Sequence, residues 1–498
     1  MRIFGNMKSK YLYLLLLILA LHLALLVFFT AHRFVGSDEG FYLNAARMAG
    51  MGKTPYIDFF FSQMSLFPVL FSSLALDGWN SFWVLRGVAV AAGFLSALLL
   101  FGIALKVTRN VGVALLALSL YSFSGLTISI HSVFEPLVFA NLLALATFFF
   151  WLLFHEKRNI IYLIMLGLSL SALINLRIIF AILLPIYACS LWRSEADRRL
   201  KLSLVFVLAL VPFSIPNLLL FHRAPQHFLQ NTFVFQIFRG EEANLAGIFL
   251  QKLAVFAKMI IEPYLFLLLI AVIASVKFLR QERRLSSRYQ LFDSPEGMAL
   301  LNLVALAAVY LVPYPILRHY AEQYLGFAII VASLSAERMI AVFNENIPLK
   351  WQKFVTGGLI ALLALSLVPY YAIFIKGIRP DDQKYEIAEV QRISSQMRLL
   401  AEKSDTVLSE WAGFSFFSQQ IPLPLTEILG FEYPLPFSHE ERMKYKLCDN
   451  IYLRDELSRR TPVLAVIINE PPAAFTATLD SGYSREYQTG SVSIYKRR

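Results

Sequence analysis

The sequence has few charged residues and very few cysteines for its length. Only 16% of its 498 residues are Asp, Glu, Lys or Arg, against about 25% in soluble globular proteins. Because 57% of the residues are hydrophobic, this shortage of charge excludes an ordinary soluble enzyme and predicts a polytopic α-helical membrane protein. The two cysteines, Cys189 and Cys448, are expected on opposite sides of the membrane, which excludes a disulfide between them and a thiolate metal site.

Other common signals are also missing. The sequence contains no internal repeat, no low-complexity segment and no glycine-rich phosphate loop. Transporters often consist of two related halves, so the lack of a repeat argues against a transporter. Basic residues outnumber acidic ones by 45 to 34, and the positions of these charges must decide whether the excess reflects nucleic-acid binding or membrane topology.

Apolar runs predict eleven membrane spans. The first covers residues 11–30, about the 20 residues that a spanning helix needs, and no convincing cleavage site follows it, so we expect it to remain uncleaved. The run at 160–192 is divided at Asn175-Leu176-Arg177, because a single span there would invert every later loop. The remaining spans are expected at 82–105, 111–130, 136–154, 160–175, 177–192, 203–221, 251–276, 298–313, 321–336 and 354–375.

The order of the loops explains the positive charge. With a cytoplasmic amino terminus, eleven spans place five short connections inside, and these are the basic ones, as the positive-inside rule requires. They are residues 106–110, 155–159, 193–201, 277–288 and 338–353. We therefore predict a multi-pass protein of the inner (plasma) membrane that does not bind nucleic acid.

The loop after the first span, residues 31–80, carries the clearest functional signal. Its segment 37–68 is too polar to cross a bilayer and too aromatic for a free linker, so we expect it to lie on the outer membrane surface. Ser37 is expected to cap a helix with Asp38 and Glu39 in its first turn, where the helix dipole favours negative charge.

The rest of this loop follows from local signals. Gly50 and Gly52 are expected to end the helix, and Tyr42 shares a face with Asp38. A second interfacial segment is expected over residues 58–67. Two carboxylates fixed beside a membrane form a candidate active site; the alternative is that they only favour a helix start.

Residues 377–498 change in character and predict a small α/β domain outside the cytoplasm, while residues 1–376 form the transmembrane domain. We expect a helix over 385–402, a strand over 406–410, and a capping box at Ser438 and Glu441 that opens a helix toward Arg460. Strands over 463–468 and 492–495 complete the domain.

Ionisable residues at the outer ends of spans suggest a site there, because charge inside a bilayer is costly. Carboxylates activate hydroxyl groups, and arginines hold phosphates. Three alternatives remain open: Glu135 only begins a helix, Arg177 only reaches lipid headgroups, or the histidines bind a metal, for which no spacing motif is present. These outer residues are His131, Glu135, Arg177, Arg318 and His319.

The order of these motifs resembles the GT-C superfamily of membrane glycosyltransferases, and in particular the branch with protein O-mannosyltransferases and lipid A aminoarabinose transferases. The likeness extends over nearly the whole chain. It is carried by one span followed by Asp38-Glu39-x-x-Tyr42, the Gly-x-x-Pro-Tyr56 turn, Glu135-Pro136, Asn175-Leu176-Arg177, Arg318-His319-Tyr320 and a soluble carboxy-terminal domain.

This resemblance implies inverting transfer of a sugar from a polyprenyl-phosphate donor to a lipid, glycan or protein acceptor at the outer face. Asp38 would be the general base, with Glu39 and Glu135 assisting or positioning the acceptor. A single phosphate leaving group needs less neutralisation than a diphosphate, so no cofactor is required; a divalent metal is not excluded, but nothing in the sequence supports one. The resemblance assigns Arg177, Arg318 and Tyr320 to the donor phosphate, and Tyr42, Tyr56, His131 and His319 to the substrate lining.

One departure concerns the donor. Aminoarabinose transferases carry Glu-Lys-Pro-Pro where this chain has Ser62-Gln63-Met64-Ser65, so their phosphate-contacting lysine is missing. Two other functions remain as alternatives: a transporter or flippase of lipid-linked sugars, and a glycan polymerase or ligase that uses diphosphate-linked lipids. Such a polymerase would not need the Asp-Glu loop.

Overall fold

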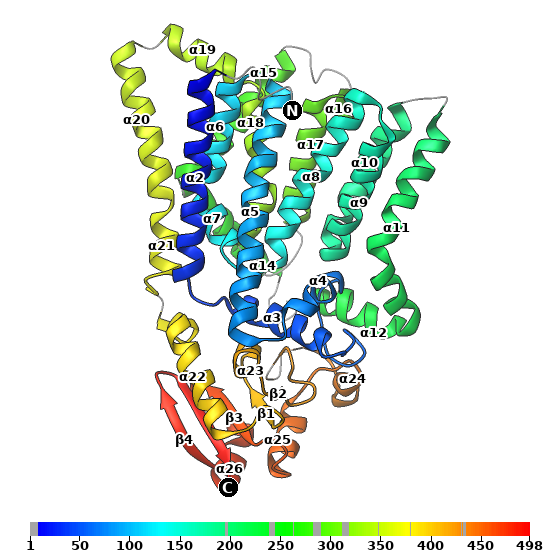
Figure 1. Cartoon of the computed structure of the whole chain (residues 1–498), viewed down its shortest axis with the longest axis vertical. Helices are drawn as coiled ribbons and strands as arrows, with labels where there is room; N and C mark the ends of the chain where they lie inside the picture. Colours follow the sequence, from blue (N-terminus) through cyan, green and yellow to red (C-terminus); the bar gives the residue numbers. More distant parts are fainter. Residues whose placement is uncertain are drawn as a thin grey trace.

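The computed structural model of the chain describes residues 8–194, 198–238, 245–261, 263–281, 290–310, 318–346, 348–378, 380–429, 431 and 435–498. A bundle of long helices forms one end of the molecule, and a small layer of helices and strands covers the other end (Figure 1). The amino terminus lies at the far end of the bundle and the carboxy terminus in the small layer.

Most bundle helices are apolar. Among the described residues, six helices are long and apolar enough to cross a membrane, or up to eight if each bent pair counts as one span. The helices are α2 (Ser9–His32), α5 (Gly78–Thr108), α6 (Val111–Ser122), α7 (Gly125–His131), α8 (Pro136–Lys157), α9 (Ile160–Leu176), α10 (Leu183–Ser194), α11 (Arg199–Arg223), α15 (Pro263–Gln281), α17 (Pro295–Tyr310), α18 (Glu322–Ser333), α19 (Ala336–Asn346), α20 (Leu349–Ser366) and α21 (Val368–Phe374).

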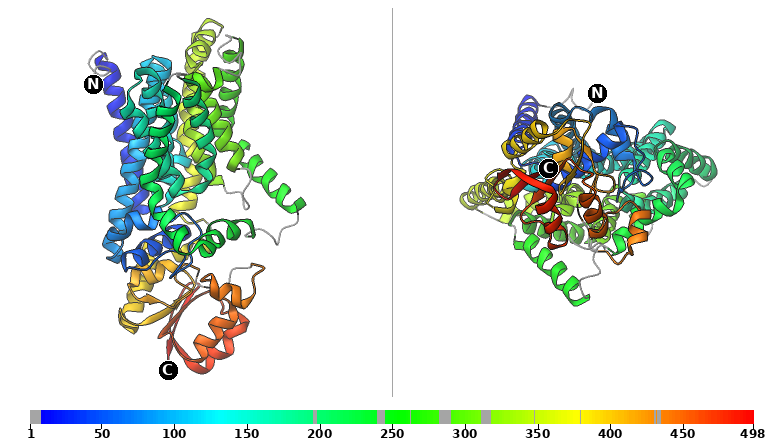
Figure 2. Two further views of the ribbon diagram at one scale, coloured as in Figure 1. Left: turned by 90° about the vertical axis from the view of Figure 1, so that its right-hand side faces the viewer. Right: turned by 90° about the horizontal axis from the view of Figure 1, so that it is seen from below.

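Two predicted boundaries can be compared directly. The break inside 160–192 is confirmed, since α9 ends at Leu176 and the short helix η2 (Ile178–Ile182) precedes α10. The prediction of a single span over 251–276 is wrong. Helix α14 (Leu245–Ile261) ends inside this range, and a new helix, α15, begins at Pro263, which lacks a backbone N–H. Helix α14 points away from the bundle (Figure 2, left). The count of eleven spans stays a prediction.

Between the bundle and the small layer lies α3 (Ser37–Gly50) (Figure 1). Its end at Gly50 is as predicted, but its N-cap residue is Gly36 rather than Ser37. The side chain of Glu39 supplies the cap instead, accepting a hydrogen bond from the Gly36 N–H at 3.2 Å. Ser37 therefore does not act as the predicted cap.

The expected interfacial segment over 58–67 is also different. The first helix after α3 is the short α4 (Leu66–Phe71), followed by η1 (Ser72–Leu74). Residues 59–61 are three phenylalanines that are at most 3% exposed. They pack within the protein, for example Phe60 against Phe235 with ring centroids 4.7 Å apart, so these rings are buried in protein rather than in lipid.

The carboxy-terminal layer contains one five-stranded sheet in the order β2-β1-β3-β5-β4. Strand β1 is parallel to β2 and β3, and β5 is antiparallel to β3 and β4. The elements are η6 (Pro380–Tyr385), α22 (Ile387–Leu400), β1 (Thr406–Ser409), α23 (Ala412–Ser418), β2 (Ile421–Pro422), α24 (His439–Lys444), α25 (Asn450–Ser458), β3 (Leu464–Ile468), α26 (Ala473–Gly482), β4 (Tyr483–Thr489) and β5 (Val492–Arg497).

The predicted elements of this layer are largely present. Helix α22 and strands β1, β3 and β5 fall where the sequence places them, and the capping box of Ser438 and Glu441 is formed. One long helix from Ser438 to Arg460 is wrong, since the chain turns after α24 and Asp449 caps the separate helix α25. Both cysteines are free.

Candidate active site

The two acidic residues at the start of α3 lie in opposite environments. Asp38 is exposed, whereas Glu39 is completely buried. The Glu39 carboxylate accepts hydrogen bonds from Arg86 Nε at 2.9 Å and Arg86 Nη2 at 2.7 Å. It also accepts one from the Phe134 N–H at 2.9 Å. Glu39 thus anchors the amino-terminal end of α3 to α5 and to the loop before α8, while Asp38 faces outward.

Arg86 completes this anchor. Its Nη1 donates to the carbonyl oxygens of Thr30 at 2.6 Å and Arg33 at 3.2 Å, and its Nη2 donates to the carbonyl of Phe34 at 2.9 Å. These carbonyls belong to the end of α2 and the segment after it. One buried arginine therefore fixes the path of the chain from the first span to Asp38.

Five of the residues predicted from sequence converge beside the exposed end of α3. Burial raises the pKa of the Tyr42 hydroxyl well above its ordinary value, and four other groups lie close enough to influence it. Tyr42 therefore stays a neutral hydrogen-bonding group at physiological pH. The four groups are Arg177, Asp38, Glu135 and Tyr320.

Glu135 is the second carboxyl group of this cluster. It occupies the N-cap position of α8 and is 8% exposed. A Cβ atom added to Gly36 would lie 3.2 Å from Glu135 Oε1, so the small residue before α3 allows this close approach. Burial, with the Asp38 charge as the next cause, raises the pKa of Glu135 to about 8. Glu135 therefore holds a proton at neutral pH beside an ionisable Asp38.

Arg177 and two tyrosines complete the cluster. Arg177 is the C-cap residue of α9, and its guanidinium carbon lies 5.7 Å from the ring centroid of Tyr320. The Tyr320 ring in turn lies 5.2 Å from that of Tyr310, at the end of α17. The break between α9 and α10 thus brings a cation to the carboxyl groups. Sequence reasoning missed Tyr310, which ends an apolar helix without a local motif.

Of the other predicted site residues, His131 and Tyr56 pair with groups outside the cluster, whereas His319 packs against Tyr320 of the cluster. His131 is completely buried, and its Nε2 lies 2.8 Å from Glu322 Oε1. Tyr56 is also buried, and its hydroxyl donates to the carbonyl of Gln63 at 2.7 Å. His319 contacts the edge of Tyr320 at 4.7 Å. Arg318 begins the short helix η5 (Arg318–Ala321), but its side chain lies outside the described part.

The carboxy-terminal layer holds α3 from the other side, which no sequence motif indicated. Trp411 Nε1 donates to the Ser37 carbonyl at 3.0 Å, and a Cβ at Gly40 would lie only 2.4 Å from the Trp411 ring. Further along α3, buried Arg47 donates to three carbonyl oxygens, those of Ser415, Gln419 and Gln420. The helix that carries Asp38 is therefore fixed by both parts of the molecule.

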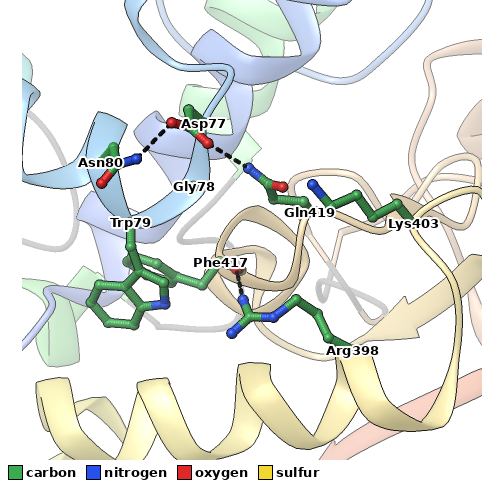
Figure 3. Close-up of a pocket in the computed structure, with 8 residues that line it drawn as sticks. All are labelled: Asp77, Gly78, Trp79, Asn80, Arg398, Lys403, Phe417 and Gln419. Carbon is green, nitrogen blue, oxygen red and sulfur yellow. Dashed lines mark hydrogen bonds between the residues drawn. The ribbon is translucent and has the colours of Figure 1, made fainter.

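A separate hollow of about 260 Å³ lies at the same seam (Figure 3). In it, Asp77 Oδ2 accepts from Asn80, and Asp77 Oδ1 accepts from Gln419 Nε2 at 3.4 Å. Gln419, which lines this hollow, accepts a hydrogen bond from Arg47 through its carbonyl oxygen. Arg47 lies nine residues after Asp38 in α3, or about 13 Å further along the helix. The hollow is thus distinct from the acidic cluster. Its lining residues are Asp77, Gly78, Trp79, Asn80, Arg398, Lys403, Phe417 and Gln419.

No group of three or more His, Cys, Asp or Glu side chains within the described ranges is arranged to hold a metal ion. The acidic cluster instead contains two carboxyl groups, a guanidinium and tyrosine hydroxyls. These groups can accept a proton from an alcohol and stabilise a developing anion.

Comparison with solved structures identifies this architecture. ArnT from Cupriavidus metallidurans bound to undecaprenyl phosphate superposes with a TM-score of 0.65 at 14% sequence identity, over 97% of each chain. The chain therefore has a GT-C fold. No protein-family profile matches the sequence, and no curated protein sequence matches it either.

A second GT-C structure shows the same relationship. An oligosaccharyltransferase from Archaeoglobus fulgidus, tethered to an acceptor peptide, superposes with a TM-score of 0.54 at 12% identity. The match covers 98% of this chain and 74% of the archaeal one. The resemblance inferred from sequence is thus confirmed at the level of the fold, including the carboxy-terminal part.

Proposed function

We propose that the protein is an integral-membrane glycosyltransferase that moves a sugar from a polyprenyl-phosphate donor to a lipid, glycan or protein acceptor. The observation that carries this proposal is the convergence of Asp38, Glu135 and Arg177 at one end of an apolar bundle. The GT-C fold supports it, and the bound undecaprenyl phosphate in the ArnT structure supports the choice of donor.

In this mechanism Asp38 acts as the general base. The acceptor hydroxyl oxygen attacks the anomeric carbon while its proton passes to the Asp38 carboxylate. The bond between the anomeric carbon and the phosphate oxygen breaks, and the electron pair remains on that oxygen. Because the attack occurs in one displacement, the anomeric configuration is inverted.

The leaving phosphate gains negative charge, and Arg177 is the cation that would stabilise it. Protonated Glu135 can donate a hydrogen bond to a substrate oxygen, and Tyr42 and Tyr320 would line the substrate. We assign Glu39 a positioning role, because its carboxylate already accepts hydrogen bonds from Arg86, Gly36 and Phe134.

The membrane topology belongs to the same proposal. Eleven spans with a cytoplasmic amino terminus place α3 and the carboxy-terminal domain outside the cytoplasm, on the outer face of the plasma membrane. The basic connections on the opposite side support this orientation. Cysteine labelling of exposed positions in α25 by a membrane-impermeant reagent in intact cells would test it.

The decisive experiment compares the wild-type chain with Asp38→Asn in membranes supplied with a radiolabelled polyprenyl-phosphate sugar. We expect label to move to a new acceptor with wild type, and a loss of about 10²–10⁴-fold in rate with the variant. Equal transfer by both proteins would remove Asp38 as the base. Movement of intact labelled lipid across the bilayer, without transfer, would instead support a flippase.

We also propose that transfer needs no divalent metal, because one phosphate leaving group can be neutralised by arginine. The same assay with excess EDTA should retain its rate. A loss of activity that Mg²⁺ or Mn²⁺ restores would show that a metal takes part.

A further inference from the structure

Arg33, directly after α2, has a buried guanidinium without an acceptor. The residue is 5% exposed, and neither Nε nor Nη1 has a hydrogen-bond partner. The guanidinium carbon lies 4.1 Å from the ring centroid of Phe374. That contact uses the face of the guanidinium and leaves its N–H groups available.

The other buried arginines at this end of the bundle are different. Arg86 makes five hydrogen bonds to carbonyl and carboxylate oxygens, and Arg47 makes three to carbonyl oxygens. Buried polar groups in folded proteins are almost always hydrogen-bonded. The unused donors of Arg33 therefore indicate a partner with oxygen acceptors that joins the protein from outside.

The surroundings of Arg33 locate that partner at the acidic cluster. Glu135 and Glu39 are the carboxyl groups that act electrostatically on Arg33. Glu39 is already occupied by Arg86, and Glu135 also interacts with Arg177. Arg33 and Arg177 thus approach the same carboxyl group from two different helices, α2 and α9.

We propose that Arg33 binds the phosphate of the lipid-linked donor, sharing it with Arg177. This inference rests on the proposed function and adds a phosphate-binding residue to its site. A guanidinium presents parallel N–H groups that match two phosphate oxygens. Two arginines supply the two positive charges that balance a phosphomonoester dianion, which is the form in which the carrier lipid leaves.

Two properties separate this role from a structural one. A structural arginine stabilises the free protein, so its removal lowers the unfolding temperature. A ligand-binding arginine with unused buried donors does not, and its replacement by a neutral side chain leaves the unfolding temperature unchanged or raises it. Ligand binding then supplies the stabilisation that only the arginine protein shows.

The test uses the full chain purified in nanodiscs, with undecaprenyl phosphate as the probe and native mass spectrometry as the readout. The variants are Arg33→Gln and Arg33→Lys, and the control is Arg223→Gln, an exposed arginine at the end of α11. Undecaprenol, which lacks the phosphate, and inorganic phosphate, which lacks the lipid, are measured in parallel.

We expect Arg33→Gln to weaken undecaprenyl phosphate binding at least tenfold, Arg33→Lys to recover part of it, and Arg223→Gln to bind as wild type. Undecaprenol binding should be equal in all four proteins. Competition by millimolar inorganic phosphate would show that the site takes the phosphate alone; no competition would show that it needs the lipid as well.

Two results would overturn the inference. One is unchanged undecaprenyl phosphate binding by folded Arg33→Gln. The other is a lower unfolding temperature for both Arg33 variants with unchanged affinity, which would make Arg33 a structural residue. Since binding is measured without transfer, either result leaves the proposed function standing, whereas a wild-type chain that binds no undecaprenyl phosphate would remove the proposed donor itself.

Discussion

Glu39 and Arg86 form a buried ion pair that joins α3 to α5, with two hydrogen bonds of 2.9 and 2.7 Å and no solvent exposure of either side chain. Glu39 directly follows Asp38 in sequence, yet Glu39 is completely buried and Asp38 is exposed. The proposed base can therefore stay exposed while its neighbour holds the helix in place.

Breaking this pair should destabilise the protein. Removing one partner of a buried ion pair costs about 3–5 kcal/mol, so Arg86→Met and Glu39→Met should each lower the unfolding temperature markedly. The double variant Glu39→Met with Arg86→Met should lose less than the sum of the two, because no charge is left unpaired. Unfolding followed by tryptophan fluorescence in detergent measures all four proteins, and strictly additive losses would contradict the coupling.

The close contact between Gly40 and Trp411 should tolerate no side chain at position 40. A methyl group at Gly40 would lie 2.4 Å from the indole ring, so Gly40→Ala must displace either α3 or the carboxy-terminal layer. We expect its transfer rate to fall at least tenfold, because a displacement of Asp38 by about 1 Å is enough for a large loss.

A compensating change tests the cause of that loss. Trp411→Leu leaves space beside position 40, so the double variant with Gly40→Ala should be more active than Gly40→Ala alone. Gly87, where an added Cβ meets no atom within 4 Å, gives the matched control Gly87→Ala. If the double variant is no better than Gly40→Ala, the clash is not what inactivates it.

The pH dependence of the protein's stability should reveal the raised pKa of Glu135. Its pKa is raised from 4.5 to about 8 in the folded protein, first by burial and then by Asp38. Between these values the folded state binds more protons than the unfolded state, so Glu135 makes the protein less stable as pH rises from about 5 to 8. Above about 8 this contribution levels off.

Glu135→Gln removes the titration while keeping the shape of the side chain. The difference in unfolding temperature between this variant and wild type should therefore widen in favour of the variant between pH 5 and 8. Thermal unfolding at unit steps of pH gives this difference, and a constant difference across that range would mean that Glu135 titrates normally.

Arg177 should affect the transition state more than the binding of substrate. Arg177→Gln removes the cation beside the departing phosphate, and losses of about 10²–10³ in kcat are typical when such a donor is deleted. Arg177→Lys should recover part of the rate, because the charge is kept while the planar geometry is lost. A change confined to KM would instead assign Arg177 to ground-state binding.

The sequence was sufficient for features that depend on local patterns. A deficit of charge and long apolar runs predict a helical membrane protein because backbone groups in lipid must be paired within a helix. The break at Asn175 to Arg177, the end of α3 at Gly50, the capping box at Ser438 and strands β1, β3 and β5 have similar local causes. Glu135, Arg177 and Tyr320 were selected at the outer ends of spans, and Asp38 and Tyr42 in the loop after the first span; the structure places all five together.

Other features depend on contacts between distant residues. Whether Asp38 or Glu39 faces outward could not be read from two neighbouring acids, since the direction is set by Arg86, 47 residues beyond Glu39. Phe59 to Phe61 are buried in protein instead of lipid because they meet distant partners such as Phe235. The close packing at Gly40 likewise depends on a distant residue, Trp411. Local sequence therefore determined which residues end the spans, whereas tertiary packing decided which of them are buried anchors and which are exposed, because burial and pairing are properties of the assembled bundle.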